Sequence, residues 1–172
     1  MTDSIEMLVD PNDDDVSDLV DVLVDCVEGG ASVNFVRPLG RDTAVAWWRA
    51  ALADEHAVTW VARDVEGSII GCVRLVLAQQ PNGQHRGEVS KTLVRRRSRG
   101  RGVATDLLSA LEAWAGAHGR HRLVLDTETG SDAERVYQRL GWQRVGVVPD
   151  FCRSADGRLA STTYYTKGLA SG

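Results

Sequence analysis

The chain has 172 residues, 43% of them hydrophobic, and a formal net charge of −4 at pH 7. This size predicts one globular domain over 1–172 with a sizeable core, and the acidic balance argues against nucleic acid as the main partner. No apolar run approaches the roughly 20 residues of a membrane span, and the N-terminus lacks the basic and apolar regions of a signal peptide. We therefore expect a cytoplasmic protein with no membrane partner.

The first third of the chain predicts one strand and two helices. The apolar run at 5–9 predicts the strand, and the acidic cluster at 13–15 predicts the start of a helix, where negative side chains are favoured. Apolar residues then recur at helical spacing until Gly29-Gly30, which end the helix. Asp42 is predicted to cap the second helix. The small and polar segment between the helices fits a plain linker as well as a loop that contacts a ligand.

Three antiparallel strands are predicted next, separated by turn signals, at 57–63, 68–78 and 87–94. A helix starting at Val103 leads to a buried strand at 122–127. Because a strand–helix–strand crossover is right-handed, the strands on either side of this helix should be parallel neighbours.

The last part of the chain predicts one helix and two strands. Ser131 and Glu134 form the pattern of a capping box at the start of the helix. The strands are expected at 142–148 and 162–167, with a loop over 150–159 between them.

A basic loop at 97–104 lies between a strand and a helix. Unpaired N–H groups at the helix start favour an anion there, and Gly100 and Gly102 let it approach the backbone closely. The loop lacks the Lys-Ser/Thr of a P-loop and the third glycine of a dinucleotide fingerprint. Its arginines fit a phosphate-binding loop or a solvated basic run.

The cysteines Cys26, Cys72 and Cys152 are odd in number and far apart. They indicate neither a disulfide framework nor a CxxC metal site, so we expect buried free thiols and no metal.

The motif R-x-x-G-x-G followed by x-A at 97–104 resembles the pyrophosphate-binding loop of the GNAT (Gcn5-related) N-acetyltransferases, and the predicted element order extends this resemblance over the whole chain. Similarity to the tabtoxin-resistance branch is carried by GGASVNF, QQPNGQHRGEVSKTLV, RSRGRGVA, LDTETGSDAERVYQRLGW and the segment 154–159. The resemblance implies an α/β fold with a mixed, mostly antiparallel twisted sheet, a parallel splayed central strand pair and about four helices.

The resemblance also implies acetyl-coenzyme A (acetyl-CoA) as cosubstrate. The pantetheine arm would meet Leu93 and Val94. The pyrophosphate would meet the loop residues Arg97, Arg99, Gly100, Arg101, Gly102, Val103 and Ala104. Ser131 stands where many members carry an asparagine that contacts the cofactor.

Three residues are candidates for the chemistry. Tyr137 matches the family tyrosine next to the sulfur, where a phenol protonates the leaving thiolate; core packing is its alternative. Asp126 is favoured as the base because the tabtoxin-resistance branch pairs an aspartate with that tyrosine. Glu88 competes with it, since other branches place a glutamate base there. Either carboxylate could instead anchor a substrate ammonium.

The implied activity is direct acetylation of a primary amine on a small molecule, such as a tabtoxin-like toxin, an antibiotic or an amino-acid-like metabolite, with toxin resistance as its consequence. Asp126 and Glu88 would bind the ammonium group. A carboxylate on the acceptor would be bound by loop amides around Gly30 and Ala31, with Ser32 and Lys91. A protein or peptide acetyltransferase and an acyl-CoA-binding module without turnover stay open, and a homodimer is compatible with the resemblance.

Overall fold

The computed structural model describes residues 4–170, so both ends of the predicted domain and part of the N-terminus lie outside the described residues. The elements are β1 (Ser4–Met7), α1 (Asp13–Glu28), α2 (Arg41–Leu52), β2 (Ala57–Arg63), β3 (Ile69–Leu77), β4 (Arg86–Val94), the 3-10 turn η1 (Arg96–Ser98), α3 (Val103–Ala117), β5 (Arg122–Glu128), α4 (Asp132–Arg139), β6 (Gln143–Arg153) and β7 (Leu159–Gly168). This order confirms the predicted one.

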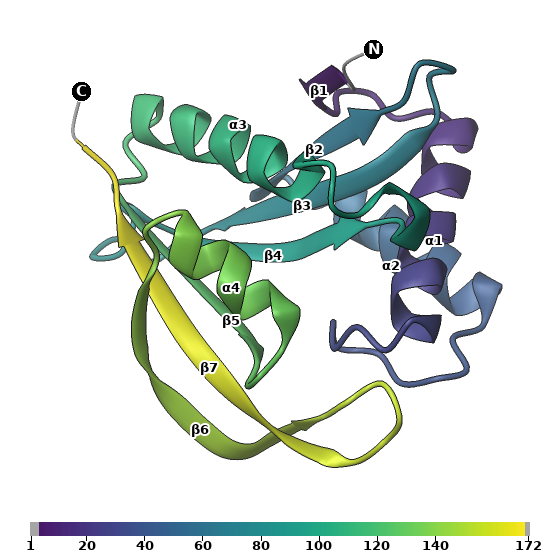
Figure 1. Ribbon diagram of the computed structural model, residues 1–172. Coiled ribbons are helices and arrows are strands. Elements are labelled where there is room, and N and C mark those ends of the chain that lie inside the picture. The colour runs from purple at the N-terminus through teal and green to yellow at the C-terminus, as the bar shows by residue number, and fades with distance from the viewer. Residues whose placement is uncertain (1–3, 171–172) are drawn as a thin grey trace.

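The strands form one twisted seven-stranded sheet in the order β1-β2-β3-β4-β5-β7-β6. All neighbouring pairs are antiparallel except β4 and β5, which are parallel as the crossover argument predicted. Helices α3 and α4 cover one face of the sheet, and α1 and α2 cover the other (Figure 1). The predicted fold class is therefore confirmed.

Strands β4 and β5 are hydrogen-bonded only at one end and then separate. Their paired residues run from Arg86 opposite Arg122 to Glu88 opposite Val124, and β5 continues alongside β7 alone. The two ribbons diverge beyond this point in Figure 1. The gap in the strand pairing leaves backbone groups on the C-terminal half of β4 without a strand neighbour on one side, which is where a ligand can bind to them.

A bulge in β4 decides which way its side chains point. Leu93 lies opposite Cys72 and Ser90 lies opposite Arg74, so two residues of β4, Lys91 and Thr92, share the place of one. Lys91 has a left-handed backbone with φ 52°, which is unusual for a residue with a Cβ. Such strain, of order 1–3 kcal/mol, is often found at functional sites.

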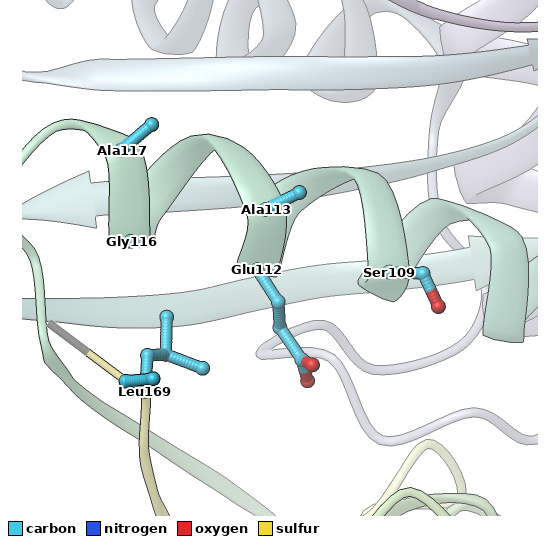
Figure 2. A pocket seen from close by; sticks show the side chains of 7 residues that line it. Ser109, Glu112, Ala113, Gly116, Ala117 and Leu169 are labelled. Carbon is cyan, nitrogen blue, oxygen red and sulfur yellow. The ribbon is translucent and has the colours of Figure 1, made fainter. Parts of the chain in front are cut away.

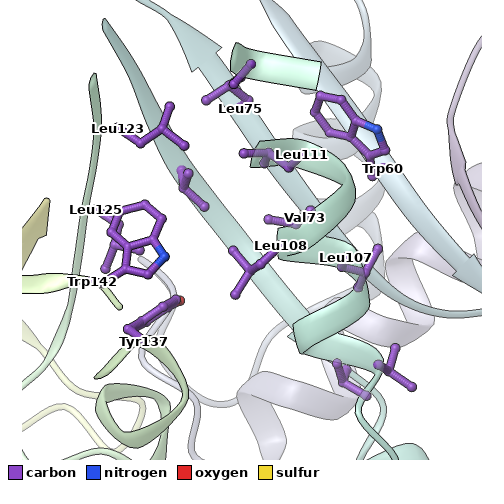
Figure 3. Close-up of a cluster of buried hydrophobic side chains, with 14 of the residues drawn as sticks. Trp60, Val73, Leu75, Leu107, Leu108, Leu111, Leu123, Leu125, Tyr137 and Trp142 are labelled. Carbon is purple, nitrogen blue, oxygen red and sulfur yellow. The ribbon is translucent and has the colours of Figure 1, made fainter. Parts of the chain in front are cut away.

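Two apolar clusters hold the helices to the sheet. Leu107, Leu108 and Leu111 of α3 are fully buried against the sheet in the first cluster, which also includes Tyr137 (Figure 3). Full burial of each leucine contributes roughly 1.5–3 kcal/mol. The second cluster packs α1 and α2 on the other face around the fully buried Trp48. The sheet between these clusters is thus a rigid support for residues in the splay.

Three local predictions need correction. The N-cap of α2 is Gly40, so Asp42 lies inside the first turn, where it still favours the helix dipole. Ser131 is the N-cap of α4 but makes no side-chain cap; the Glu134 carboxylate accepts from the Gly130 N–H instead of from Ser131. The expected loop over 150–159 is shorter and covers only 154–158, because β6 and β7 pair as far as Arg153 and Leu159.

Candidate functional site

The basic loop after β4 is bound to helix α1 by two of its arginines. Arg95 Nη2 donates to Asp18 Oδ1 at 3.1 Å, and the Arg96 backbone N–H donates to Asp25 Oδ2 at 2.7 Å. Arg96 Nε adds a bond of 2.9 Å to Asp25 Oδ1. Arg95 and Arg96 therefore hold the loop against α1. The loop does not form a continuous basic surface of the kind that binds nucleic acid.

The remainder of the loop leads into the N-terminus of α3. Gly100 and Gly102 have left-handed backbones with φ 76° and 87°, and no atom lies within 4 Å of the place where a Cβ would stand. Gly102 is the N-cap of α3 and no side chain caps this end. Arg99 Nε donates to Val94 O at 3.2 Å, which fixes the loop against the end of β4. An anion can thus approach the first N–H groups of α3.

The expected arm-binding residues lie at the start of this loop. Leu93 and Val94 are buried, as is Val103, while Ala104 is half-buried and Arg97 and Arg101 are exposed. Thr92 of β4 has a buried Oγ1 that faces the Tyr137 hydroxyl closely enough to lower the pKa of the phenol. Thr92 therefore lies on the α4 side of the splay, next to Tyr137.

Tyr137 comes from α4 and lies against the splay on the α3 side of the sheet. It is 6% exposed, and its ring packs 5.9 Å from Trp142 and 6.1 Å from Tyr165, measured between centroids. Burial raises the pKa of the Tyr137 hydroxyl; the hydrogen bond with Thr92 lowers it in part, the charge of Asp126 raises it, and the net direction is upward. The phenol therefore keeps its proton at neutral pH, as a proton donor must.

Asp126 and Glu88 lie on the two sides of the splay. Side chains alternate along β5 and Leu125 points toward the α3 cluster, so Asp126 points to the face covered by α1 and α2. Thr162 of β7 donates to Asp126 Oδ2 at 2.7 Å, which holds the carboxylate in one orientation. Glu88 is exposed, and it is the last residue of β4 that pairs with β5. Both carboxylates are open to solvent.

Lys91 is the other ionic group on this face. Its Nζ lies 4.7 Å from the centroid of the Trp47 ring and 5.8 Å from that of Phe35. Burial lowers the pKa of the Lys91 ammonium, and the neighbouring Arg74 guanidinium lowers it further. Ring faces attract the charge but accept no ordinary hydrogen bond from it.

The loop after α1 meets the β6–β7 hairpin over this face. Arg37 N donates to Ala155 O at 2.8 Å, and Ser32 Oγ lies 3.9 Å from Cys152 Sγ. The amides of Gly30 and Ala31 are not available to an acceptor, which corrects their expected role. They donate to Val27 O and Cys26 O and end helix α1, with Gly30 at φ 92°.

Several site residues were missed by sequence reasoning. Thr92, Thr162 and Tyr164 lie along the splay, and Trp47 reaches the site from α2. The adjacent tryptophans Trp47 and Trp48 were the one feature of the sequence that pointed to α2. Successive residues on a helix point in different directions, so Trp48 packs in the core while Trp47 is only half-buried and reaches the site.

Other features of the described chain do not belong to this site. A pocket between α3 and the end of the chain, lined by Ala113, Gly116 and Leu169 among others, contains none of the site residues described above (Figure 2). Cys26, Cys72 and Cys152 are free, and the first two are buried as predicted, whereas Cys152 is only half-buried, which corrects the expectation for that residue. Within residues 4–170, no group of three or more His, Cys, Asp or Glu side chains is arranged to hold a metal. Nor does any helix there have the length and hydropathy to cross a bilayer.

The residues present fit the acetyl-CoA that the sequence resemblance implies. The uncapped end of α3 with its two open glycines suits a pyrophosphate, and the part of β4 that β5 leaves unpaired offers backbone groups to an arm rich in amides. Ser131 Oγ lies 3.2 Å from Thr127 Oγ1, so the contact expected from Ser131 competes with that interaction.

Comparison with known proteins agrees with this geometry. Residues 21–142 match the model of the acetyltransferase (GNAT) family. The fold is similar to an N-acetyltransferase from Staphylococcus aureus Mu50, at 21% identity and TM-score 0.81 over 99% of this chain and 100% of that one. It is similar to yncA, a putative acetyltransferase from Salmonella typhimurium solved with its cofactor acetyl-CoA, at 20% identity and TM-score 0.79 over 100% and 96%.

A phosphinothricin acetyltransferase from Sinorhizobium meliloti, in complex with acetyl-CoA, also shares the fold at 20% identity and TM-score 0.79, over 100% of this chain and 91% of that one. These identities show a common fold, whereas the family match covers most of the chain and includes the loop, the splay and Tyr137. The chain therefore belongs to the GNAT acetyltransferase family.

Proposed function

We propose that this enzyme transfers the acetyl group of acetyl-CoA directly to a primary amine of a small molecule. The observation that carries the proposal is the hydrogen bond from Arg37 N to Ala155 O, which joins the loop after α1 to the β6–β7 hairpin. The two segments meet on the face of the sheet that carries Lys91 and Asp126, which we call the acceptor face. A protein acceptor needs an open surface, since stable protein interfaces bury roughly 1,200–2,000 Å².

The cosubstrate, when bound, supplies an acetyl group activated as a thioester. The loop residues from Arg97 to Ala104 and the N-terminus of α3 bind its pyrophosphate, and Leu93 and Val94 bind the arm. This part of the proposal follows from the open glycines, and it is supported by the two neighbours solved with acetyl-CoA.

The chain's own groups move the protons. Asp126, oriented by Thr162, takes the proton of the acceptor ammonium so that the nitrogen becomes a nucleophile. As the C–N bond forms and the C–S bond breaks, Tyr137 donates the proton of its hydroxyl to the departing sulfur, for which its raised pKa keeps it protonated beforehand. The second proton released by the nitrogen returns Tyr137 to its phenol form. Glu88 attracts the ammonium and is the second candidate for the base.

The acceptor class within the proposal is a toxin, an antibiotic or an amino-acid-like metabolite. The motifs shared with the tabtoxin-resistance branch support this choice, as does the fold shared with a phosphinothricin acetyltransferase. Acetylation of such a toxin would give resistance to it.

The test is thiol release from acetyl-CoA with a library of free amines, run in parallel with lysine-containing proteins. Turnover of small amines but not of proteins is expected. Turnover of proteins alone would refute the small-molecule acceptor, and binding of acetyl-CoA with no turnover of either would make the chain an acyl-CoA-binding module.

A further inference from the structure

Lys91 is a buried cation that no acidic side chain contacts. Lys91 is 8% exposed, and its Nζ lies against the rings of Trp47 and Phe35. Within residues 4–170, Nζ forms no hydrogen bond and no ion pair. A buried ammonium group normally has an anionic partner, so this arrangement is incomplete without another molecule.

A second buried cation lies on the same face. Arg74 of β3 is 6% exposed and lies opposite Ser90, the residue before Lys91. Arg74 Nη2 is paired with Asp54 Oδ2 at 3.4 Å, but its Nε is buried without a hydrogen-bond partner among the described residues. The positive charge of Arg74 acts on Lys91, so the two groups repel each other unless an anion lies near them.

The acidic side chains of the acceptor face, Asp126 and Glu88, do not contact Lys91 or Arg74. The charges of Asp126 and Glu88 favour the ammonium form of Lys91, yet neither carboxylate forms an ion pair with it. Both are exposed, and Asp126 is oriented by Thr162. The acceptor face therefore has a positive end against the Trp47 ring and a negative end at Asp126 and Glu88.

We propose that Lys91 binds an anionic group of the acceptor, so that the substrate is a zwitterion carrying a carboxylate or similar oxyanion as well as the amine. This inference rests on the proposed small-molecule function and names the class of acceptor. The left-handed bulge at Lys91 turns its side chain onto the acceptor face, and the Trp47 and Phe35 rings hold the ammonium in place. Asp126 and Glu88 then receive the amine end.

The experiment compares amino acids with their own carboxamides as acceptors, because each pair shares the amine and the side chain and differs in the negative charge. In the parent enzyme, kcat/KM should be at least ~10-fold higher for the acid. Lys91→Met keeps the length of the side chain and removes the charge, so the preference should fall to about 1, mainly through KM. Lys91→Arg should retain part of it. Arg49→Met, which removes an exposed positive charge from α2, should leave the preference unchanged.

A folding defect does not imitate this result, because both substrates are measured on one preparation and a loss of active enzyme lowers both rates equally. A second readout needs no turnover: N-acetyl amino acids should raise the Tm of the parent and not that of Lys91→Met. Equal use of acid and carboxamide by the parent overturns the inference while the proposed function stands. An acid preference that persists in Lys91→Met overturns the role of Lys91. Turnover of proteins but of no small amine refutes the proposed function, and this inference with it.

Discussion

Asp25 of α1 accepts two hydrogen bonds from Arg96, one from the backbone N–H at 2.7 Å and one from Nε at 2.9 Å. Burial pushes the pKa of the Asp25 carboxyl upward, but these bonds and the Arg96 charge outweigh it and hold the pKa below its ordinary value. The contact makes the position of the phosphate-binding loop depend on a helix some seventy residues earlier in the chain.

Asp25→Asn should destabilise the protein by about 1 kcal/mol at pH 7 and weaken acetyl-CoA binding. The folded pKa of Asp25 is depressed, so its stabilisation is present above the unfolded value near ~3.9 and is lost as pH falls through the folded pKa. Urea unfolding from pH 7 down to about pH 3 should show the gap between parent and variant narrowing below about pH 4. A gap that stays constant over this range would contradict the linkage.

Gly102→Asp should abolish thermal stabilisation by acetyl-CoA, because it adds a side chain and a negative charge at the open N-terminus of α3. Ligand at ~100 times its Kd stabilises the parent by about 2.7 kcal/mol. Gly67→Asp is the matched control, since Gly67 has a similar φ of 89° in the β2–β3 turn and equal space around it. Both variants should lose stability, but Gly67→Asp should still respond to the ligand. No response from the parent would end the cofactor proposal.

Tyr137→Phe should lower kcat by the ~10²-fold to 10⁴-fold typical of a general acid while leaving the Tm nearly unchanged. Tyr165→Phe removes a hydroxyl from the same ring cluster, where it donates to Glu134 at 3.1 Å, and should have little effect on kcat. Steady-state kinetics with thermal melts of both variants test this. Equal kcat in Tyr137→Phe and the parent would leave Tyr137 a packing residue.

Asp126→Asn and Glu88→Gln should show which carboxylate is the base and which one binds the ammonium group of the acceptor. We expect Asp126→Asn to reduce kcat by ~10²-fold or more and Glu88→Gln to act mainly on KM for the amine. Thr162→Val, which removes the donor to Asp126 Oδ2, should reproduce a smaller part of the kcat loss. The reverse pattern, with the kcat effect at Glu88, would exchange the two roles.

Ser32→Val should raise KM for the amine without changing the affinity for acetyl-CoA, because the Ser32 hydroxyl faces Cys152 of the β6–β7 hairpin. Gly30 is unsuitable for this test, since a β-branched residue at φ 92° is strained whatever the loop binds. Titration of both substrates against the variant separates the two affinities. An unaltered KM for the best acceptor would remove this loop from the acceptor site.

The sequence alone predicted the order of the elements, which the structure confirms, and it placed the loop that we propose to bind phosphate between β4 and α3. Both depend on signals that lie close together in the chain: helical spacing from Val16 to Val27, the stop at Gly29-Gly30, and the glycines between β4 and α3. The parallel pairing of β4 and β5 also followed from local order, because the handedness of a crossover is nearly invariant.

Only the tertiary structure decided how the acceptor face is built. The bulge that turns Lys91 toward Trp47, the support of Asp126 by Thr162 and the contact of Ser32 with Cys152 join residues far apart in the chain. The Gly30 and Ala31 amides looked free for a ligand until the helix carbonyls of Val27 and Cys26 were seen to bind them. Such contacts depend on packing and on competition for hydrogen-bond partners across the whole fold, which no local pattern of residues encodes.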